Sequence, residues 1–234
     1  MSELIWSRPR SGLFAPILLA VLLTLPGCGG LTDPVQAMQE SLASAPEYMI
    51  ILEDMQEEPG FFPKYYHRYK VVQGSRERVS GWVEVQESIY KKYEPFLGMA
   101  LSAKSDEGVT DTPHPAGYHY VGNPQYGHWG GGGGSFWVFY GQYAMMRSLM
   151  GGGQSIYRRD YDDYRGNRGR GRPYYGPNRE YGTGGSVTKQ RKPGFYERRK
   201  QAMARRKSSF SRRVQNRVGR GRTGFGSRGG GFGK

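Results

Sequence analysis

Three histidines lie close together in the sequence, in a segment that also carries carboxylates. His114, His119 and His128 fall within fifteen residues, and Asp106 and Glu107 precede them. Imidazole and carboxylate groups are the usual protein ligands of zinc and copper. The separations of five and nine residues match no compact metal motif. The sequence therefore predicts a solvated loop with no bound metal or other cofactor, and metal binding by the three histidines is the alternative.

The same segment is rich in aromatic side chains that could stack on the faces of sugar rings. The series consists of Tyr118, Tyr120, Tyr126 and Trp129. Exposed rings of this kind would suit glycan binding. Packing of the rings over a small sheet, with their polar tips in water, is the interpretation that we favour.

Two stretches near the C-terminus combine arginine with glycine, namely residues 165–172 (RGNRGRGR) and 219–234 (GRGRTGFGSRGGGFGK). They resemble the Arg-Gly boxes of RNA-binding proteins. Arginine supplies bidentate phosphate contacts, and interleaved aromatic rings can stack on bases. The candidate polyanion-binding residues are Arg165, Arg168, Arg170, Arg172, Arg198, Arg199, Arg205, Arg206, Arg212, Arg213, Arg220 and Arg222.

Residues 195–218 form the one stretch of the C-terminal third with helical potential. Apolar side chains are spaced by seven, seven, four and four residues in a strongly basic context, at Tyr196, Met203, Phe210, Val214 and Val218. A narrow apolar stripe among cations resembles a helix that lies on an anionic membrane. A fluctuating, solvated helix is the alternative.

The sequence contains no recognisable catalytic arrangement. A nucleophile elbow, an HExxH pair and a phosphate-binding loop between a strand and a helix are all missing from it. We therefore predict that the protein is not an enzyme, with a periplasmic enzyme or metal-binding protein that uses residues 104–129 as an alternative.

The only cysteine of the chain, Cys28, follows a short apolar segment. Arg8 and Arg10 precede the apolar run 13–25, which is too short to span a bilayer. A positive region, an apolar region and small residues in this order are typical of a secretory signal. Residues 25–28 (Leu-Pro-Gly-Cys) resemble the lipobox of bacterial lipoproteins.

This resemblance implies cleavage before Cys28 and attachment of lipid to its sulfur and to the new amino terminus. Residues 1–27 would be the signal peptide and residues 28–46 a lipidated tether. Because Gly29 follows the cysteine, and not an aspartate, the resemblance implies the outer membrane, on its periplasmic or surface face, if the source is Gram-negative. The expected location is the cell envelope.

Charge and composition divide the rest of the chain near residue 151. Residues 1–150 hold 11 basic and 15 acidic side chains, whereas residues 151–234 hold 23 basic and 5 acidic ones. Val, Ile, Met and Phe together supply only nine residues of this last segment. So little apolar area cannot offset an ordering cost of about 1–2 kcal/mol per residue. Residues 151–234 are predicted to be a largely disordered, basic, Gly/Arg-rich tail.

Between tether and tail, residues 47–150 are predicted to form a small α+β domain. Alternating or continuous apolar runs predict strands over 48–55, 64–72 and 79–85. Spacing by four predicts a helix over 85–97, and apolar residues on or near one stripe predict a second helix over 136–149, capped by Ser135. The expected domain thus has about three short strands and two helices.

These features together predict an envelope lipoprotein of structural or interaction type. It would be held at the membrane by its lipid, and its basic tail would engage anionic lipids, lipopolysaccharide or wall polymers. An Arg-Gly-rich nucleic-acid-binding protein is the second alternative, although export separates the chain from intracellular RNA. The sequence names no protein partner.

Overall fold

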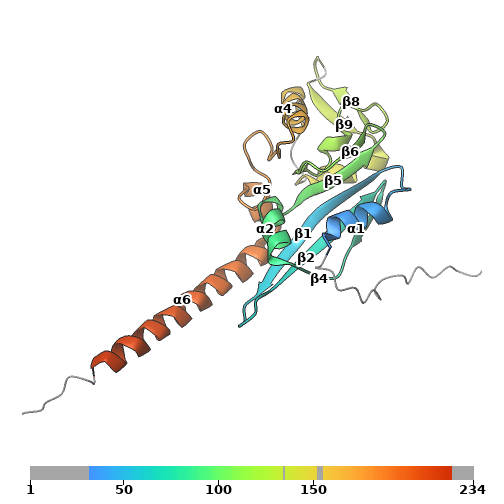
Figure 1. The fold of residues 1–234 in the computed structure, drawn as a ribbon. Coiled ribbons are helices and arrows are strands. Elements are labelled where there is room, and N and C mark those ends of the chain that lie inside the picture. Colours follow the sequence, from blue (N-terminus) through green and yellow to red (C-terminus); the bar gives the residue numbers. More distant parts are fainter. Residues whose placement is uncertain (1–31, 134, 152–154, 223–234) are drawn as a thin grey trace, which may run out of the picture. The chain divides into compact units, whose positions relative to one another are not determined.

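The computed structural model describes residues 32–133, 135–151 and 155–222 (Figure 1). The predicted signal peptide (residues 1–27) and Cys28 lie outside the described residues, as do residues 223–234. The first described element is helix α1 (Pro34–Ser41), which begins after Asp33. The Asp33 carboxylate accepts a 3.0 Å hydrogen bond from the Val35 amide, and proline is favoured at the first position of a helix.

The main sheet is antiparallel throughout, in the order β3-β2-β1-β5-β6, with β4 beside β2 and β7 beside β5. Its strands are β1 (Tyr48–Glu58), β2 (Lys64–Gln73), β3 (Arg76–Val79), β4 (Val83–Val85), β5 (Met99–Ser105), β6 (Gly108–Thr110) and β7 (His114–Pro115). The expected strands over 48–55 and 64–72 are confirmed, and as β1 and β2 they pair antiparallel in a hairpin. The expected strand over 79–85 is instead divided between β3 and β4.

Both faces of the central strand β1 are buried, and the two faces belong to different cores. Met49 and Ile51 pack in one hydrophobic cluster, whereas Ile50 and Leu52 pack in the other. Alternate residues of a strand point to opposite faces, so a continuous apolar run suits a strand that is covered on both sides. Helix α1 packs in the second cluster through Val35.

The expected helix over 85–97 is shorter in the structure. Val85 pairs with Tyr65 as the end of β4, and the helical part consists of α2 (Glu87–Tyr93) followed by η1 (Glu94–Phe96). Gly98 comes directly after it with a φ of +77°, a backbone conformation that favours glycine.

The expected helix over 136–149, with Ser135 as its N-cap, is wrong. Residues 136–139 form strand β9 (Phe136–Phe139), which pairs with β8 (Gly127–Gly130) in a second sheet. Trp137 and Phe139 are buried while their neighbours are only half-buried, which is the period of a strand. The segment then continues through η3 (Gly141–Tyr143) and the short helix α3 (Met145–Leu149).

The structure confirms the α+β class, with more strands than expected: nine within the described residues. The folded domain does not end near residue 151 as expected, because much of the segment after this residue is folded onto the sheet. This segment contains α4 (Arg158–Gly169), α5 (Ser186–Arg191) and α6 (Pro193–Arg222). The aromatic side chains that it buries are Tyr164, Tyr174, Tyr181 and Phe195.

Tyrosine explains this correction. Residues 151–234 hold seven tyrosines, which a count of Val, Ile, Met and Phe leaves out. The ring of a tyrosine buries as much area as other large apolar side chains, so tyrosines can add to a core. Tyr164 and Tyr174 complete the first core, next to Tyr118 at ring-centroid distances of 5.7 and 5.4 Å.

Candidate functional site

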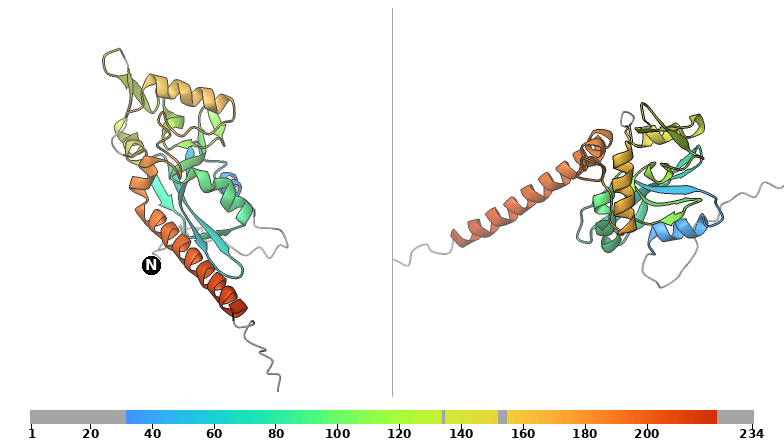
Figure 2. Two further views of the ribbon diagram at one scale, coloured as in Figure 1. Left: turned by 90° about the vertical axis from the view of Figure 1, so that its left-hand side faces the viewer. Right: turned by 90° about the horizontal axis from the view of Figure 1, so that it is seen from above.

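Helix α6 is the most basic element that the structure describes. Its thirty residues hold eleven Lys and Arg and a single acidic residue, Glu197. The expected helix over 195–218 is confirmed and extends by a few residues at both ends. At about 1.5 Å per residue, α6 is about 45 Å long. It runs beside the β1–β2 hairpin (Figure 2).

Two adjacent carboxylates on β1 hold the start of α6. The register between β1 and β2 shifts between Leu52 and Asp54, which marks a β-bulge. Leu52 and Met55 belong to the same core although they are three residues apart. Glu53 and Asp54 lie between these two core residues, and the bulge allows both of their side chains to point toward the C-terminal segment.

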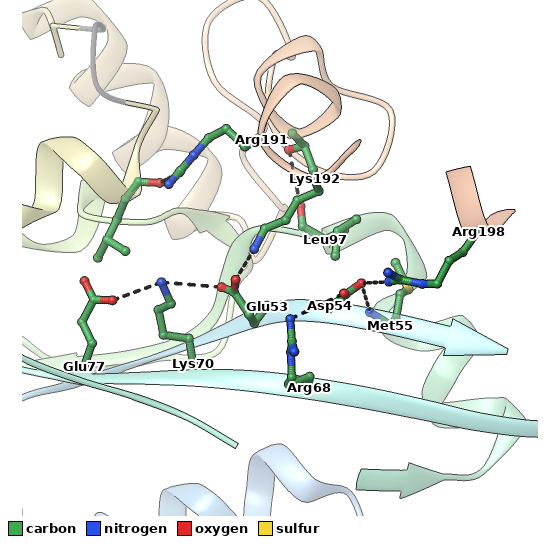
Figure 3. Close-up of polar contacts among 12 residues, drawn as sticks. Glu53, Asp54, Met55, Arg68, Lys70, Glu77, Leu97, Arg191, Lys192 and Arg198 are labelled. Carbon is green, nitrogen blue, oxygen red and sulfur yellow. Dashed lines mark hydrogen bonds and ion pairs between the residues drawn. The ribbon is translucent and has the colours of Figure 1, made fainter. Parts of the chain in front are cut away.

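Both carboxylates are bridged by cations from the sheet and from the C-terminal segment (Figure 3). Asp54 Oδ1 lies 2.6 Å from Arg198 Nη2, and Asp54 Oδ2 lies 3.6 Å from Arg68 Nη2. Glu53 is paired with Lys70 and with Lys192, the residue directly before α6. Charge-assisted bonds of this kind are stronger than neutral ones, so this cluster fixes where α6 leaves the sheet.

Further hydrogen bonds attach the segment before α6 to Leu97, just after η1, and to the end of α3. The Leu97 amide donates to Thr183 Oγ1 over 3.2 Å, and Tyr181 donates to the Met150 carbonyl over 3.0 Å. Arg191 donates to the Leu149 carbonyl. The base of α6 is therefore part of the folded domain.

The predicted polyanion-binding arginines fall into three groups. Arg168, Arg198 and Arg199 are ion-paired within the chain, with Glu107, Asp54 and Glu94 respectively. Four arginines have exposed side chains: Arg165 on α4, Arg170 and Arg172 just after it, and Arg205 on α6. The backbones of Arg206, Arg212, Arg213, Arg220 and Arg222 lie in α6, and their side chains are outside what the structure describes.

The distal part of α6 exposes its apolar stripe as well as its cations. Met203, Phe210 and Val214 are 56%, 68% and 44% exposed, whereas Tyr196, at the start of the stripe, is half-buried and packs against the second core. Arg205 and Lys207 are exposed between them. The stripe thus begins in the core and continues beyond it.

A groove of about 370 Å³ separates the first turns of α6 from α2 and β1. Apolar atoms of Met55, Tyr65, Tyr90 and Met203 line it, and ion pairs lie at its edge. Glu87 pairs with Lys91 at 2.6 Å, and Glu94 pairs with Arg199 at 3.0 Å. Burial raises the pKa of Tyr90 to about 12, so its hydroxyl stays neutral. Because its charges neutralise one another, the groove does not itself attract anions.

The turn between β1 and β2 carries exposed residues that sequence reasoning missed. Phe61 is 95% exposed and Phe62 is 81% exposed. The available signal was a pair of phenylalanines between Pro59-Gly60 and Pro63, that is, large apolar residues in a segment with the composition of a turn.

The structure does not bring the three candidate histidines together as a metal site. His114 and His119 are fully buried with ring centroids 6.0 Å apart, whereas His128 is exposed on β8. Burial lowers the pKa of His114 to about 4 and that of His119 to about 3. Within the described ranges, no three His, Cys, Asp or Glu side chains are grouped so that they could hold a metal ion.

The neighbouring carboxylates are used in other contacts. Asp106 accepts a 2.6 Å hydrogen bond from the Asn123 amide group, and Glu107 pairs with Arg168 at 3.4 Å. The expected loop over 104–128 instead contains β6, β7, η2 (Tyr118–Tyr120) and the start of β8. Tyr118, Tyr120 and Tyr126 are buried and Trp129 is half-buried, so the rings pack as expected. The expectation that the polar tips of these tyrosines lie in water is wrong, because the three side chains are buried whole.

Comparisons of the chain with protein-family models, with curated proteins and with solved structures found no match. Among the described residues, no helix has both the length and the apolar character needed to cross a membrane.

Proposed function

We propose that this protein is an envelope lipoprotein that binds an anionic surface through α6 and catalyses no reaction. Lipid on Cys28 would hold the chain at a membrane, and the α+β domain would carry α6 as a basic arm. The observation that carries the proposal is the charge of α6: eleven cations against one carboxylate, on a helix whose first turns are held to the sheet by the Asp54–Arg198 pair.

An anionic surface suits this arrangement better than a nucleic-acid sequence does. Recognition by Arg-Gly boxes relies on aromatic rings that are available to stack on bases. In α4, which contains most of the first box, Tyr164 is buried in the core and Arg168 is paired with Glu107. The exposed members of this box are Arg165, Arg170 and Arg172, whose charge favours contacts with phosphates or carboxylates at low selectivity.

The anchor is tested by metabolic labelling with palmitate in a bacterial host. The protein should incorporate the label and partition into detergent, and Cys28→Ala should abolish both. An unlabelled mature protein that retains Met1 would contradict the anchor and leave the role of α6 as a separate question.

The role of α6 is tested with the full chain carrying Cys28→Ser, on vesicles with and without 30 mol% phosphatidylglycerol. Binding to neutral vesicles gives the contribution of the N-terminal apolar segment. The ratio of the affinity for anionic vesicles to the affinity for neutral ones, which we call the anionic excess, measures the contribution of charge. Each cation near an anionic surface contributes about 1 kcal/mol, so loss of two cations in Arg205→Glu with Lys207→Glu should lower the anionic excess by at least about 30-fold, and the added negative charges should lower it further.

The matched control is Arg76→Glu with Arg78→Glu, which makes the same charge change on exposed positions of β3. This control should change the anionic excess much less. Equal losses in the two double variants would mean that net charge, and not α6, determines binding.

A further inference from the structure

The β1–β2 turn, residues 59–63, presents two phenylalanines to the solvent. Phe61 and Phe62 are 95% and 81% exposed, and their rings meet edge to face with centroids 4.9 Å apart. Pro59 and Pro63 bracket them and restrict the backbone of the turn. Two adjacent aromatic rings held in water are unfavourable for an isolated protein, which indicates a contact surface.

A third exposed phenylalanine lies beside this turn. Ser209 and Phe210 of α6 line one hollow together with Pro59, Gly60 and Pro63, so the turn and the helix are neighbours. The left view of Figure 2 shows α6 passing beside the hairpin. Phe210 is 68% exposed. We call Phe61, Phe62 and Phe210 the aromatic tip.

Cations accompany the apolar residues of α6 at a regular spacing. Tyr196, Met203 and Phe210 recur every seven residues, which keeps them within about 20° per step on one side of the helix. Lys200 and Lys207 follow the first two of them by four residues and are exposed. Residues four apart are neighbours on a helix, so ammonium groups border the stripe.

This combination fits a lipid bilayer better than a soluble polymer. A bilayer interface offers anionic headgroups and, a few ångströms deeper, an apolar phase that accepts aromatic rings. Lysine and arginine can lie along that boundary with their stems in the apolar layer and their charges in water. A polysaccharide or nucleic acid in solution supplies the anions and has no apolar phase to cover Phe61 and Phe62.

We infer that the aromatic tip inserts into the interface of an anionic lipid bilayer while the cations of α6 contact its headgroups. This inference rests on the proposed role of α6 and deepens it. It names a lipid membrane as the surface, and it adds residues of the β1–β2 turn to the contact.

The insertion is measured with an environment-sensitive fluorophore in the full chain carrying Cys28→Ser. One sample has Phe61→Cys labelled with NBD, and the control has Val109→Cys, a half-exposed position on β6. Vesicles contain 30 mol% phosphatidylglycerol with or without a spin-labelled lipid as quencher. The label at position 61 should shift its emission to the blue and be quenched by the lipid, whereas the label at position 109 should remain in water.

Affinity provides the second measurement. Phe61→Ser with Phe62→Ser should lower the anionic excess of vesicle binding at least about tenfold, since each ring loses its apolar transfer free energy. Val79→Ser with Val109→Ser removes two half-exposed apolar side chains elsewhere and should have little effect. Binding to heparin, a soluble polyanion, should be the same for both double variants and the parent.

The inference is overturned if the label at position 61 stays in water on vesicles that have bound the protein. Equal vesicle binding by the two serine double variants would also overturn it. In either case a loss of binding in Arg205→Glu with Lys207→Glu would still support α6 as the anionic-surface arm, so the two proposals fail separately.

Discussion

Asp54 Oδ1 accepts a 2.6 Å hydrogen bond from Arg198 Nη2, which joins two residues that are 144 positions apart in the chain. Asp54 sits at the bulge of the central strand and is largely buried, and Arg198 lies in the first turns of α6. The contact therefore holds α6, the most basic of the described elements, at a fixed place on the sheet. Arg198, which sequence reasoning assigned to polyanion binding, serves first as a clamp.

Replacing this arginine should loosen the base of α6. Arg198→Ala removes a charge-assisted hydrogen bond and leaves the buried Asp54 carboxylate with the Met55 amide, which donates to it over 2.8 Å, and with Arg68 at 3.6 Å. We expect a loss of about 1–2 kcal/mol in the free energy of unfolding, measured by urea titration. Lys200→Ala, an exposed position two residues later, is the control. A similar loss in both variants would show that the pair with Asp54 has no particular role.

Truncation should separate the folded part of the C-terminal third from its distal arm. A chain that ends at Lys200 keeps the buried rings of Tyr164, Tyr174 and Tyr181, and should unfold cooperatively near the parent temperature. A chain that ends at Gly151 loses all of them, at about 3–5 kcal/mol for each large ring removed from a core, and should have no cooperative transition. Circular dichroism during heating checks both. A stable chain 1–151 would contradict the assignment of these tyrosines to the core.

The buried histidines predict a loss of stability in acid. Burial, as the largest cause, lowers the pKa of His114 to about 4 and that of His119 to about 3, while both titrate near 6.5 when unfolded. The folded state thus binds fewer protons than the unfolded state below pH 6.5. Stability is complete above that pH and falls as the pH drops toward 4, by up to about 1.4 kcal/mol per pH unit and histidine.

A substitution identifies the source of this acid sensitivity. His119→Phe should remove about one histidine's share of the slope between pH 6.5 and pH 4, measured as urea unfolding at several pH values. His128→Phe alters an exposed ring and should leave the slope unchanged. An identical slope in His119→Phe and the parent would mean that His119 is not buried in its neutral form.

The spacing of apolar residues along the sequence predicted the strands and the helix whose buried residues recur at the spacing typical of that element. The runs around Ile50 and Tyr69 gave the right strands, and the spacing from Tyr196 to Val218 gave the right helix. The helix prediction for residues 136–139 was wrong because four consecutive large apolar residues are compatible with both the helical and the strand period. Pairing of Trp137 with Trp129 decides in favour of the strand. That pairing is tertiary information.

The sequence predicted the positive charge of the candidate site, but it did not predict which arginines are paired and which are exposed. The concentration of arginine after residue 151 is plain in the sequence, whereas its division into clamping and exposed members depends on partners such as Asp54 and Glu94. The bulge that turns Glu53 and Asp54 the same way depends on the register with β2, which composition does not fix. Phe61 and Phe62 were visible as residues, but only their exposure marks them as a surface.

The most direct test of the account is amide hydrogen exchange of the vesicle-bound protein, compared between neutral and anionic vesicles. If α6 is the arm that contacts anionic lipid, exchange should slow over residues 203–217 on vesicles with phosphatidylglycerol and remain fast there on neutral ones. Exchange in β5 should be the same in both samples. Unchanged exchange over residues 203–217 while the protein is bound to anionic vesicles would contradict the claim that α6 forms the contact.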